Sequence, residues 1–236
     1  MKLLGIGIYN RVDAGRLLGL SPGRVSSWVR GYRYAWGPKG RRKHGKQPAV
    51  IKTDIPLIDE TLAISFLELI ELFVVKQFRD KNIPLQTVRV AWNHASRAFN
   101  TQHPFANRRV FTDGGRIFMA LGNDQAVPDV LEVSSRRTPF QIIAGPVFKH
   151  SIREIEFDEN TELARRWWPQ GFDVPVVLDP LIAFGAPVLA GTRVPTTVLA
   201  RYAETRTRGA LAGAFEVSAE GVEAALSFET RLTRAA

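Results

Sequence analysis

Guanidinium and hydroxyl side chains recur at short intervals in residues 23–30, and both groups are well suited to binding nucleic acids. Arginine donates paired hydrogen bonds to guanine edges and to phosphates, and serine hydroxyls bond to either. The candidates in this segment are Arg24, Ser26, Ser27 and Arg30. We expect these four side chains to contact the base edges and phosphates of duplex DNA.

The distribution of charge supports a polyanionic partner for the same part of the chain. The 236 residues have a net charge of +9. Residues 1–53 contain twelve Lys and Arg and a single acid, Asp13, which gives +11, whereas residues 54–236 contain twenty basic and twenty-two acidic residues, which gives −2. The basic excess therefore lies entirely in the first quarter of the chain, as in a nucleic-acid-binding module.

Two short helices are predicted to position these groups. Asn10 can cap a first helix, which Gly19 ends, and Ser21 and Pro22 are a typical start for a second helix, which Gly31 ends. The apolar residues Leu17, Leu18, Val25 and Trp28 are spaced so that the second helix can pack across the first. The pattern predicts a helix-turn-helix with Trp28 in its core, and an ordinary helical hairpin is the alternative.

A basic hairpin is predicted directly after the second helix. Residues 32–36 alternate in size as a strand does, residues 37–40 have turn composition, and residues 41–44 bring the chain back. We expect this hairpin to act as a wing that contacts phosphates, and a solvated loop is the alternative. Its candidate contacts are Arg33, Lys39, Arg41, Arg42 and Lys43.

This N-terminal layout resembles the DNA-binding module of MerR-like winged helix-turn-helix regulators. In that family a Tyr precedes the first helix, as Tyr9 does here, and L-L-G-x-S-P opens the recognition helix, as residues 17–22 do. Gly15 stands where the family usually has Ala, a change that costs about 1 kcal/mol in a helix interior.

Residues 54–173 are predicted to form a mixed middle region after a linker at 46–59. Apolar residues at helical spacing predict a helix from about Leu62 to Phe78 and a second helix over 85–99. Residues 108–111 and 116–121 read as a β-hairpin around Asp113-Gly114-Gly115, and short strands are expected at 130–133 and 155–157. Residues 140–150 are assigned to a helix, although Gly145-Pro146 interrupts it.

Residues 174–236 are predicted to form a compact C-terminal domain. A strand at 174–178 leads to the string G-x-P-V-L-x-G-T-R-V-P at 185–195, and helices follow at about 195–204, 208–214 and 218–232. The whole chain is therefore expected to be α+β and mainly α. We divide it into a winged helix-turn-helix (1–53), a middle region with a β-hairpin (54–173) and a three-helix, helix-turn-helix-like domain (174–236).

The C-terminal string and the E-V-S-A-E-G-V-E-A-A-L at 216–226 resemble the antitoxin domain of bacterial toxin–antitoxin modules. The middle segments at 65–75, 103–106 and 166–169 resemble the longer members of the VapB family. That resemblance implies an antitoxin that represses its own operon and neutralises a PIN-type ribonuclease toxin. A cytoplasmic location is expected because the chain has no cysteine and its N-terminal apolar stretch, residues 3–8, is too short for a signal peptide. Many VapB proteins use a disordered tail for neutralisation, whereas this chain is expected to be folded nearly to its end.

Three arginines are candidates for binding the toxin. PIN-type active sites cluster carboxylates around a metal ion, and a guanidinium placed among carboxylates makes strong paired bonds. The candidates are Arg193, Arg231 and Arg234. For Arg193, bracing of its own turn is the favoured alternative.

Catalytic and metal-binding patterns are missing from the sequence. The chain has no cysteine, and its four histidines lie in unrelated elements. No H-E-x-x-H, G-x-S-x-G or phosphate-binding loop pattern occurs. No apolar run approaches the length of a membrane span. We therefore expect no enzymatic activity, no cofactor, no metal and no membrane insertion.

A second function class fits the same residues. A MerR-like regulator would bind a small molecule in the middle region, and an apolar pocket there with a few polar groups would favour it. In either case we expect a homodimer, because helix-turn-helix proteins usually dimerise to read palindromic operators.

Overall fold

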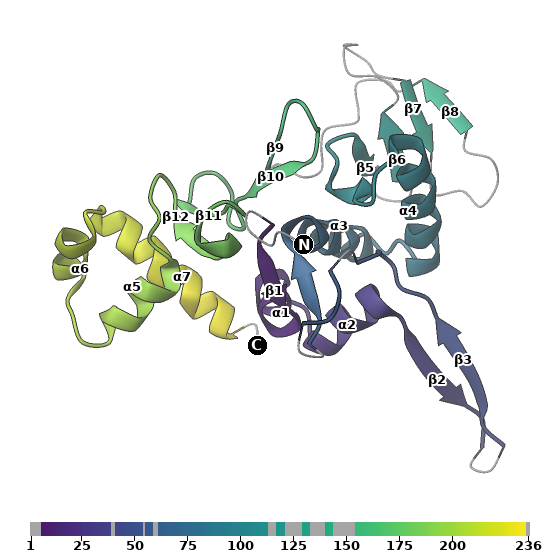
Figure 1. Cartoon of the computed structure of the whole chain (residues 1–236), viewed down its shortest axis with the longest axis horizontal. Coiled ribbons are helices and arrows are strands. Elements are labelled where there is room, and N and C mark those ends of the chain that lie inside the picture. The colour runs from purple at the N-terminus through teal and green to yellow at the C-terminus, as the bar shows by residue number, and fades with distance from the viewer. Residues whose placement is uncertain are drawn as a thin grey trace.

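The structure is a computed structural model that describes residues 6–38, 41–53, 55–58, 61–112, 117–120, 129–132, 140–143 and 154–234. Within these residues the fold mixes seven α-helices with four small antiparallel sheets (Figure 1). No helix in these ranges is long and apolar enough to cross a membrane.

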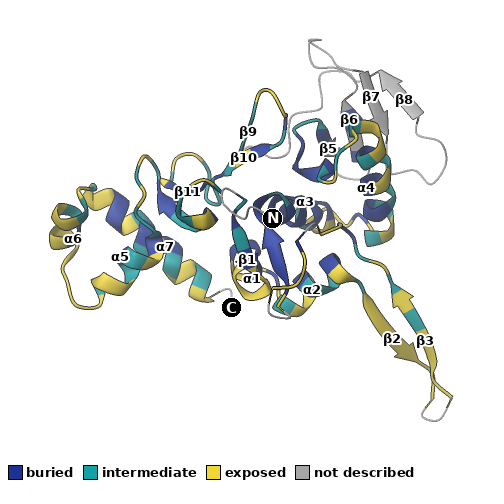
Figure 2. Ribbon diagram, viewed as in Figure 1, coloured by how far each residue is buried: buried dark blue, intermediate teal, exposed yellow. Residues whose placement is uncertain are grey.

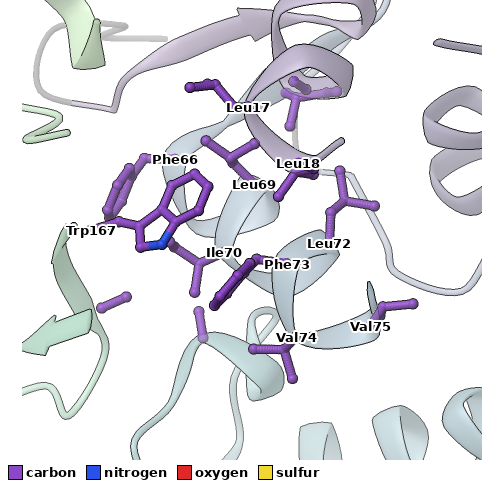
Figure 3. Packing of buried hydrophobic residues seen from close by; sticks show 14 of the residues in the cluster. Leu17, Leu18, Phe66, Leu69, Ile70, Leu72, Phe73, Val74, Val75 and Trp167 are labelled. Atoms are coloured by element: carbon purple, nitrogen blue, oxygen red, sulfur yellow. The ribbon is translucent and has the colours of Figure 1, made fainter. Parts of the chain in front are cut away.

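The N-terminal helices pack against a strand pair and a long helix. Strand β1 (Ile8–Asn10) leads into α1 (Arg11–Leu18) and α2 (Pro22–Arg30), and it pairs with β4 (Ala63–Ser65). Leu17 and Leu18 of α1 face Leu69 and Leu72 of helix α3 (Phe66–Asp80) in the core (Figure 3). The helix pair is therefore built onto the middle region of the chain.

Helices α3 (Phe66–Asp80) and α4 (Leu85–Phe99) are the largest elements of the middle region. The sequence predicts α4 with its observed bounds, whereas α3 starts four residues after Leu62 because Ser65 caps it. The Glu68 amide donates to Ser65 Oγ, and the Ser65 amide donates to the Glu68 carboxylate. The buried Glu71 carboxylate accepts hydrogen bonds from Trp92 Nε1 at 2.8 Å and from the Phe105 amide at 3.1 Å. Phe105 belongs to the short 3-10 helix η1 (Pro104–Ala106), so Glu71 joins three elements.

A four-stranded meander follows, with strands β5 (Val110–Thr112), β6 (Ile117–Ala120), β7 (Asp129–Glu132) and β8 (Phe140–Ile143). The expected hairpin and the expected strand near 130–133 are confirmed. The prediction of a helix at 140–150 is wrong over residues 140–143, which form a strand paired with β7. Branched and aromatic residues in this stretch of the sequence favour a strand. The rest of that segment, 144–150, lies outside the described residues.

The C-terminal part combines a second four-stranded sheet with three helices. The strands are β9 (Ile155–Phe157), β10 (Ala164–Trp167), β11 (Val176–Leu178) and β12 (Pro187–Leu189), in the order β12-β11-β10-β9. The 3-10 turn η2 (Ala183–Gly185) joins β11 to β12. Helices α5 (Thr196–Ala203), α6 (Arg208–Phe215) and α7 (Ala219–Arg234) follow, and α7 packs against both of the others (Figure 1).

A buried hydrogen bond joins the C-terminal part to the N-terminal strand. Tyr9 Oη donates to the Gly185 carbonyl at 2.7 Å, and burial raises the pKa of Tyr9 above its ordinary range. A Cβ at Gly185 would lie 2.4 Å from Tyr9 Oη, so this contact requires glycine. The rings of Phe73 and Trp167 add an apolar contact, with centroids 5.0 Å apart.

Candidate nucleic-acid interface

Side-chain caps fix the ends of α1 and α2. Asn10 Oδ1 accepts hydrogen bonds from the amides of Val12 and Asp13, and Ser21 Oγ accepts one from the Arg24 amide. Gly19 ends α1 in the left-handed region at φ 63°. These caps satisfy amides that a helix leaves unpaired, so both helices keep defined ends despite their short length.

The turn between the two helices depends on Gly15. The Leu20 amide donates to the Gly15 carbonyl at 2.8 Å, and a Cβ at Gly15 would lie 2.6 Å from the Leu20 carbonyl oxygen. The glycine that departs from the MerR-like pattern is therefore the residue that allows this close approach of the two backbones.

The second helix buries one face and exposes the predicted contact residues on the other. Val25, Trp28 and Val29 are buried, which confirms Trp28 as a core residue. Arg24 and Arg30 are exposed, and Ser26 and Ser27 are half-buried. Ser27 Oγ donates to the Gly23 carbonyl at 2.8 Å, which leaves its lone pairs to accept further bonds.

A two-stranded hairpin follows α2 and projects away from the rest of the molecule (Figure 1). Strand β2 (Tyr32–Trp36) pairs with β3 (Lys43–Gln47), with Arg33 opposite Lys46 and Ala35 opposite His44. The described candidates on and beside it, Arg33, Arg41, Arg42 and Lys43, are exposed (Figure 2), and Lys39 lies outside the described residues. No ion pair engages Arg24, Arg30 or these hairpin cations within the described part of the chain.

The two faces of the hairpin differ in chemistry. Tyr32, Tyr34 and Trp36 lie in a row on one face, with ring centroids 6.0 and 5.3 Å apart, and between 40% and 48% of each side chain is exposed. Gly45 leaves room for the Tyr34 ring, because a Cβ there would lie 2.6 Å from it. Alternation along the strands puts Arg33 and Lys46 on the opposite face. The row was not predicted from the sequence, although the alternation of residues 32–36 contains the signal.

Arg89 of α4 fixes the base of the hairpin. Its Nε donates to the carbonyls of Pro48 and Ala49 at 3.1 and 3.2 Å. Burial lowers the pKa of Arg89, because desolvation disfavours the charged form. The Val50 amide also donates to the Trp28 carbonyl at 2.7 Å. The direction of the hairpin is thus set by α2 and α4 together, and Arg89 and Ala49, which contact each other, are forty residues apart in the sequence.

The three candidate toxin contacts lie on two separate elements. Arg193 is exposed in the turn after β12, and Arg231 and Arg234 are exposed in the last turn of α7. The Arg231 guanidinium lies 5.1 Å from the centroid of the Phe228 ring, so part of its side chain packs on its own helix.

Arg193 lines a cavity of about 340 Å³ together with Arg166 and Trp168. Thr192 makes the hydrogen bonds of the turn, since its hydroxyl donates to the Leu189 carbonyl and accepts from the Val194 amide. Arg166 pairs with the buried Asp179 at 2.7 Å. Among the described residues no hydrogen bond or ion pair to the Arg193 side chain is found.

An apolar cavity of about 520 Å³ lies beside α3. Phe66, Leu67 and Leu163 line it, with His103 and Arg165 among its polar groups. A cavity of this kind, apolar with a few polar groups, is the feature expected of a ligand-binding regulator.

Two family models match the chain. Residues 7–92 match the family described as "Putative DNA-binding HTH domain". That range begins at β1 and ends within α4, so it includes the helix pair, the hairpin and Arg89. Residues 176–228 match the family described as "Protein of unknown function (DUF433)", which extends from β11 into α7.

The similar proteins come from Mycobacterium tuberculosis. The chain is 26% identical over 198 residues to the "Putative antitoxin VapB45", an alignment that covers 80% of this chain and 79% of that protein. The similarity to that protein extends over most of the chain, and the helix-turn-helix family matches its N-terminal part. The chain is also 24% identical over 231 residues to "Uncharacterized protein Rv2308", an alignment that covers 96% of this chain and 92% of that protein.

A solved structure has the same fold. The crystal structure of Rv2018 from the same organism matches with a TM-score of 0.61 at 20% identity, and the match covers 94% of this chain and 99% of that one. The arrangement of elements in this chain therefore occurs in a protein of nearly the same extent.

Proposed function

We propose that the protein is an antitoxin that binds promoter DNA of its own operon and neutralises a PIN-type ribonuclease toxin. The observation that carries the DNA-binding half is the exposed basic surface made by α2 and the β2–β3 hairpin, within the part of the chain that matches a helix-turn-helix family. The antitoxin half rests on the similarity to the mycobacterial antitoxin.

On DNA, α2 would act as the recognition helix and the hairpin as a MerR-like wing. Arg24 and Arg30 have the length and the paired donors to reach guanine edges, with Ser26 and Ser27 beside them. Arg33, Lys39, Arg41, Arg42 and Lys43 would neutralise phosphates on the flanking backbone. A homodimer would place two such units on the half-sites of a palindromic operator.

On the toxin, Arg193 is the candidate that the geometry favours most. It is exposed on a short turn that Thr192 holds, beside a cavity that a partner side chain can enter. A PIN-type active site would offer carboxylates to its guanidinium, and the paired bonds would compete with metal binding there. Arg231 and Arg234 are further candidates on α7.

Two measurements on the intact chain test this proposal. Co-expression with the product of the adjacent gene should give a stable complex, and the purified complex should cleave RNA far more slowly than the free toxin. The chain alone should shift its own promoter fragment in a mobility assay, but not a scrambled duplex of equal length. An unshifted promoter removes the repressor role, and a freely active partner removes the antitoxin role.

The cavity beside α3 favours a ligand-responsive regulator as a second candidate. That function would require the purified chain, without any protein partner, to change its operator affinity when a small molecule is added. The co-purification experiment separates the two candidates, because a regulator of this kind needs no product of the adjacent gene.

A further inference from the structure

A second cavity, of about 340 Å³, lies between the first helix of the helix-turn-helix and the C-terminal helices. Leu17 of α1, Pro187 of β12 and Leu232 of α7 contribute apolar side chains to its wall. Asp13 and Arg16 of α1 and Glu229 of α7 contribute the charged groups. Asp13 accepts a hydrogen bond from Asn10 Nδ2, and the two opposite charges on different helices are Arg16 and Glu229. Its volume is at the lower end of the range for ligand sites, so it suits a molecule of about amino-acid size.

The two charged groups act on each other across the cavity. The positive charge of Arg16 favours the ionised form of the Glu229 carboxylate, although burial has the larger effect and raises its pKa. No direct ion pair joins the two side chains among the described residues. Glu229 is held in place by the Thr196 hydroxyl, which donates to its Oε1. The cavity is therefore lined by the Arg16 cation and by a carboxylate that Thr196 holds in place.

The rim of the cavity contains strained backbone. Ala183 and Phe184 both have positive φ, 47° and 55°, which non-glycine residues rarely adopt. Strain of this kind persists where the surrounding structure imposes it, and it clusters at ligand sites. The Phe184 side chain lines the cavity and is 68% exposed. A large aromatic side chain is thus kept in solvent beside the cavity, where it can cover a bound molecule.

We propose that this cavity binds a small zwitterion with an apolar side chain, such as a free aliphatic amino acid, with its carboxylate on Arg16 and its ammonium on Glu229. The apolar wall would receive the side chain. Because α1 and α7 both line the site, the bound molecule would favour the arrangement of the C-terminal helices against the helix-turn-helix. This inference is independent of whether the partner protein is a nuclease.

Calorimetric titration of the full chain with three matched probes tests the proposal. The probes are L-leucine, 3-methylbutylamine, which lacks the carboxylate, and 4-methylpentanoate, which lacks the ammonium. We expect L-leucine to bind at least about tenfold more tightly than either analogue, since each analogue leaves one charge of the site unpaired.

Four variants assign the two charges. Arg16→Gln should remove the preference for L-leucine over the amine, and Glu229→Gln should remove its preference over the acid. Arg11→Gln on α1 and Glu220→Gln on α7 are the matched controls, because both side chains lie outside the cavity lining and should leave the affinities unchanged.

Two outcomes would overturn the proposal. One is that titration of the folded wild-type chain with L-leucine, up to about 10 mM, gives no heat of binding. The other is equal affinity for all three probes in both the wild type and Arg16→Gln. Promoter binding measured on the same samples without any probe reports separately on the proposed function, so either can fail alone.

Discussion

At the scale of single residues, Gly15 shows how a contact can reverse the effect that helix propensity predicts. Replacing a glycine inside a helix by alanine usually stabilises the helix by about 1 kcal/mol. At Gly15 the new methyl group would meet the Leu20 carbonyl oxygen at 2.6 Å, and a backbone carbonyl cannot move aside without opening the turn between α1 and α2.

Gly15→Ala should therefore destabilise the protein, by about 1–3 kcal/mol, the usual cost of overpacking. Gly213→Ala in α6 is the matched control, since a Cβ there meets nothing within 4 Å and should be neutral or stabilising. Urea denaturation of both variants measures the difference. A Gly15→Ala protein as stable as the wild type would mean that the turn is looser than described.

The arginines of α2 and those of the hairpin tip should differ in kind. Losing a base contact at Arg24 or Arg30 should weaken the free energy of binding to the operator by about 1–3 kcal/mol and should reduce sequence preference. Arg41→Ala and Arg42→Ala should instead weaken binding to operator and scrambled duplex alike, because phosphates are the same in both. Fluorescence anisotropy with the two duplexes measures each variant, and equal small losses throughout would contradict the assignment.

At the scale of elements, the hairpin depends on a helix far from it in the sequence. Arg89 donates to the Pro48 and Ala49 carbonyls, where the hairpin rejoins the body. The two strands of the hairpin contain no buried residue, since all five residues of β2 are exposed and those of β3 are exposed or half-buried. Its direction is therefore controlled by its base.

Arg89→Met keeps most of the side-chain volume but removes both hydrogen bonds, and charge-assisted bonds are worth about 1.5–3 kcal/mol. We expect faster amide exchange across β2 and β3 and weaker operator binding. Arg97→Met, an exposed change on the same helix, is the control for loss of charge. If both variants bind the operator equally well, the hydrogen bonds of Arg89 to Pro48 and Ala49 do not control the hairpin.

At the scale of the whole molecule, the uneven charge predicts a strong dependence of DNA binding on salt. If the basic N-terminal quarter neutralises about six phosphates, log K should fall against log salt with a slope near −5. Titrations of the promoter fragment at several potassium chloride concentrations measure it. A slope near zero would remove the electrostatic basis of DNA binding.

The proposed DNA and toxin surfaces are expected to be separable. Arg193 follows β12, and Figure 1 shows β12 far from the β2–β3 hairpin. Arg193→Glu should abolish inhibition of RNA cleavage, since it opposes carboxylates with a carboxylate, and should leave operator binding unchanged. The Arg41→Ala and Arg42→Ala pair should do the reverse. Loss of both activities in either variant would indicate a shared surface or a folding defect.

The sequence by itself determined the local features of this protein. Asn10, Gly19, Ser21 and Pro22 act through hydrogen bonds and dihedral preferences within four residues, so the limits of α1 and α2 follow from neighbours alone. The apolar repeat of 85–99 predicts α4 for the same reason. The exposure of Arg24 and Arg30 then follows from helical periodicity.

Only the tertiary structure decided which distant residues meet. The pairing of β1 with β4, the Arg89 clamp and the Tyr9 hydrogen bond to Gly185 join positions between 40 and 176 residues apart. Such contacts depend on strand register and on how helices pack, which no local pattern encodes. For that reason the sequence could identify Gly15 as a departure from a family, whereas the backbone contact that requires a glycine there became visible only in the fold.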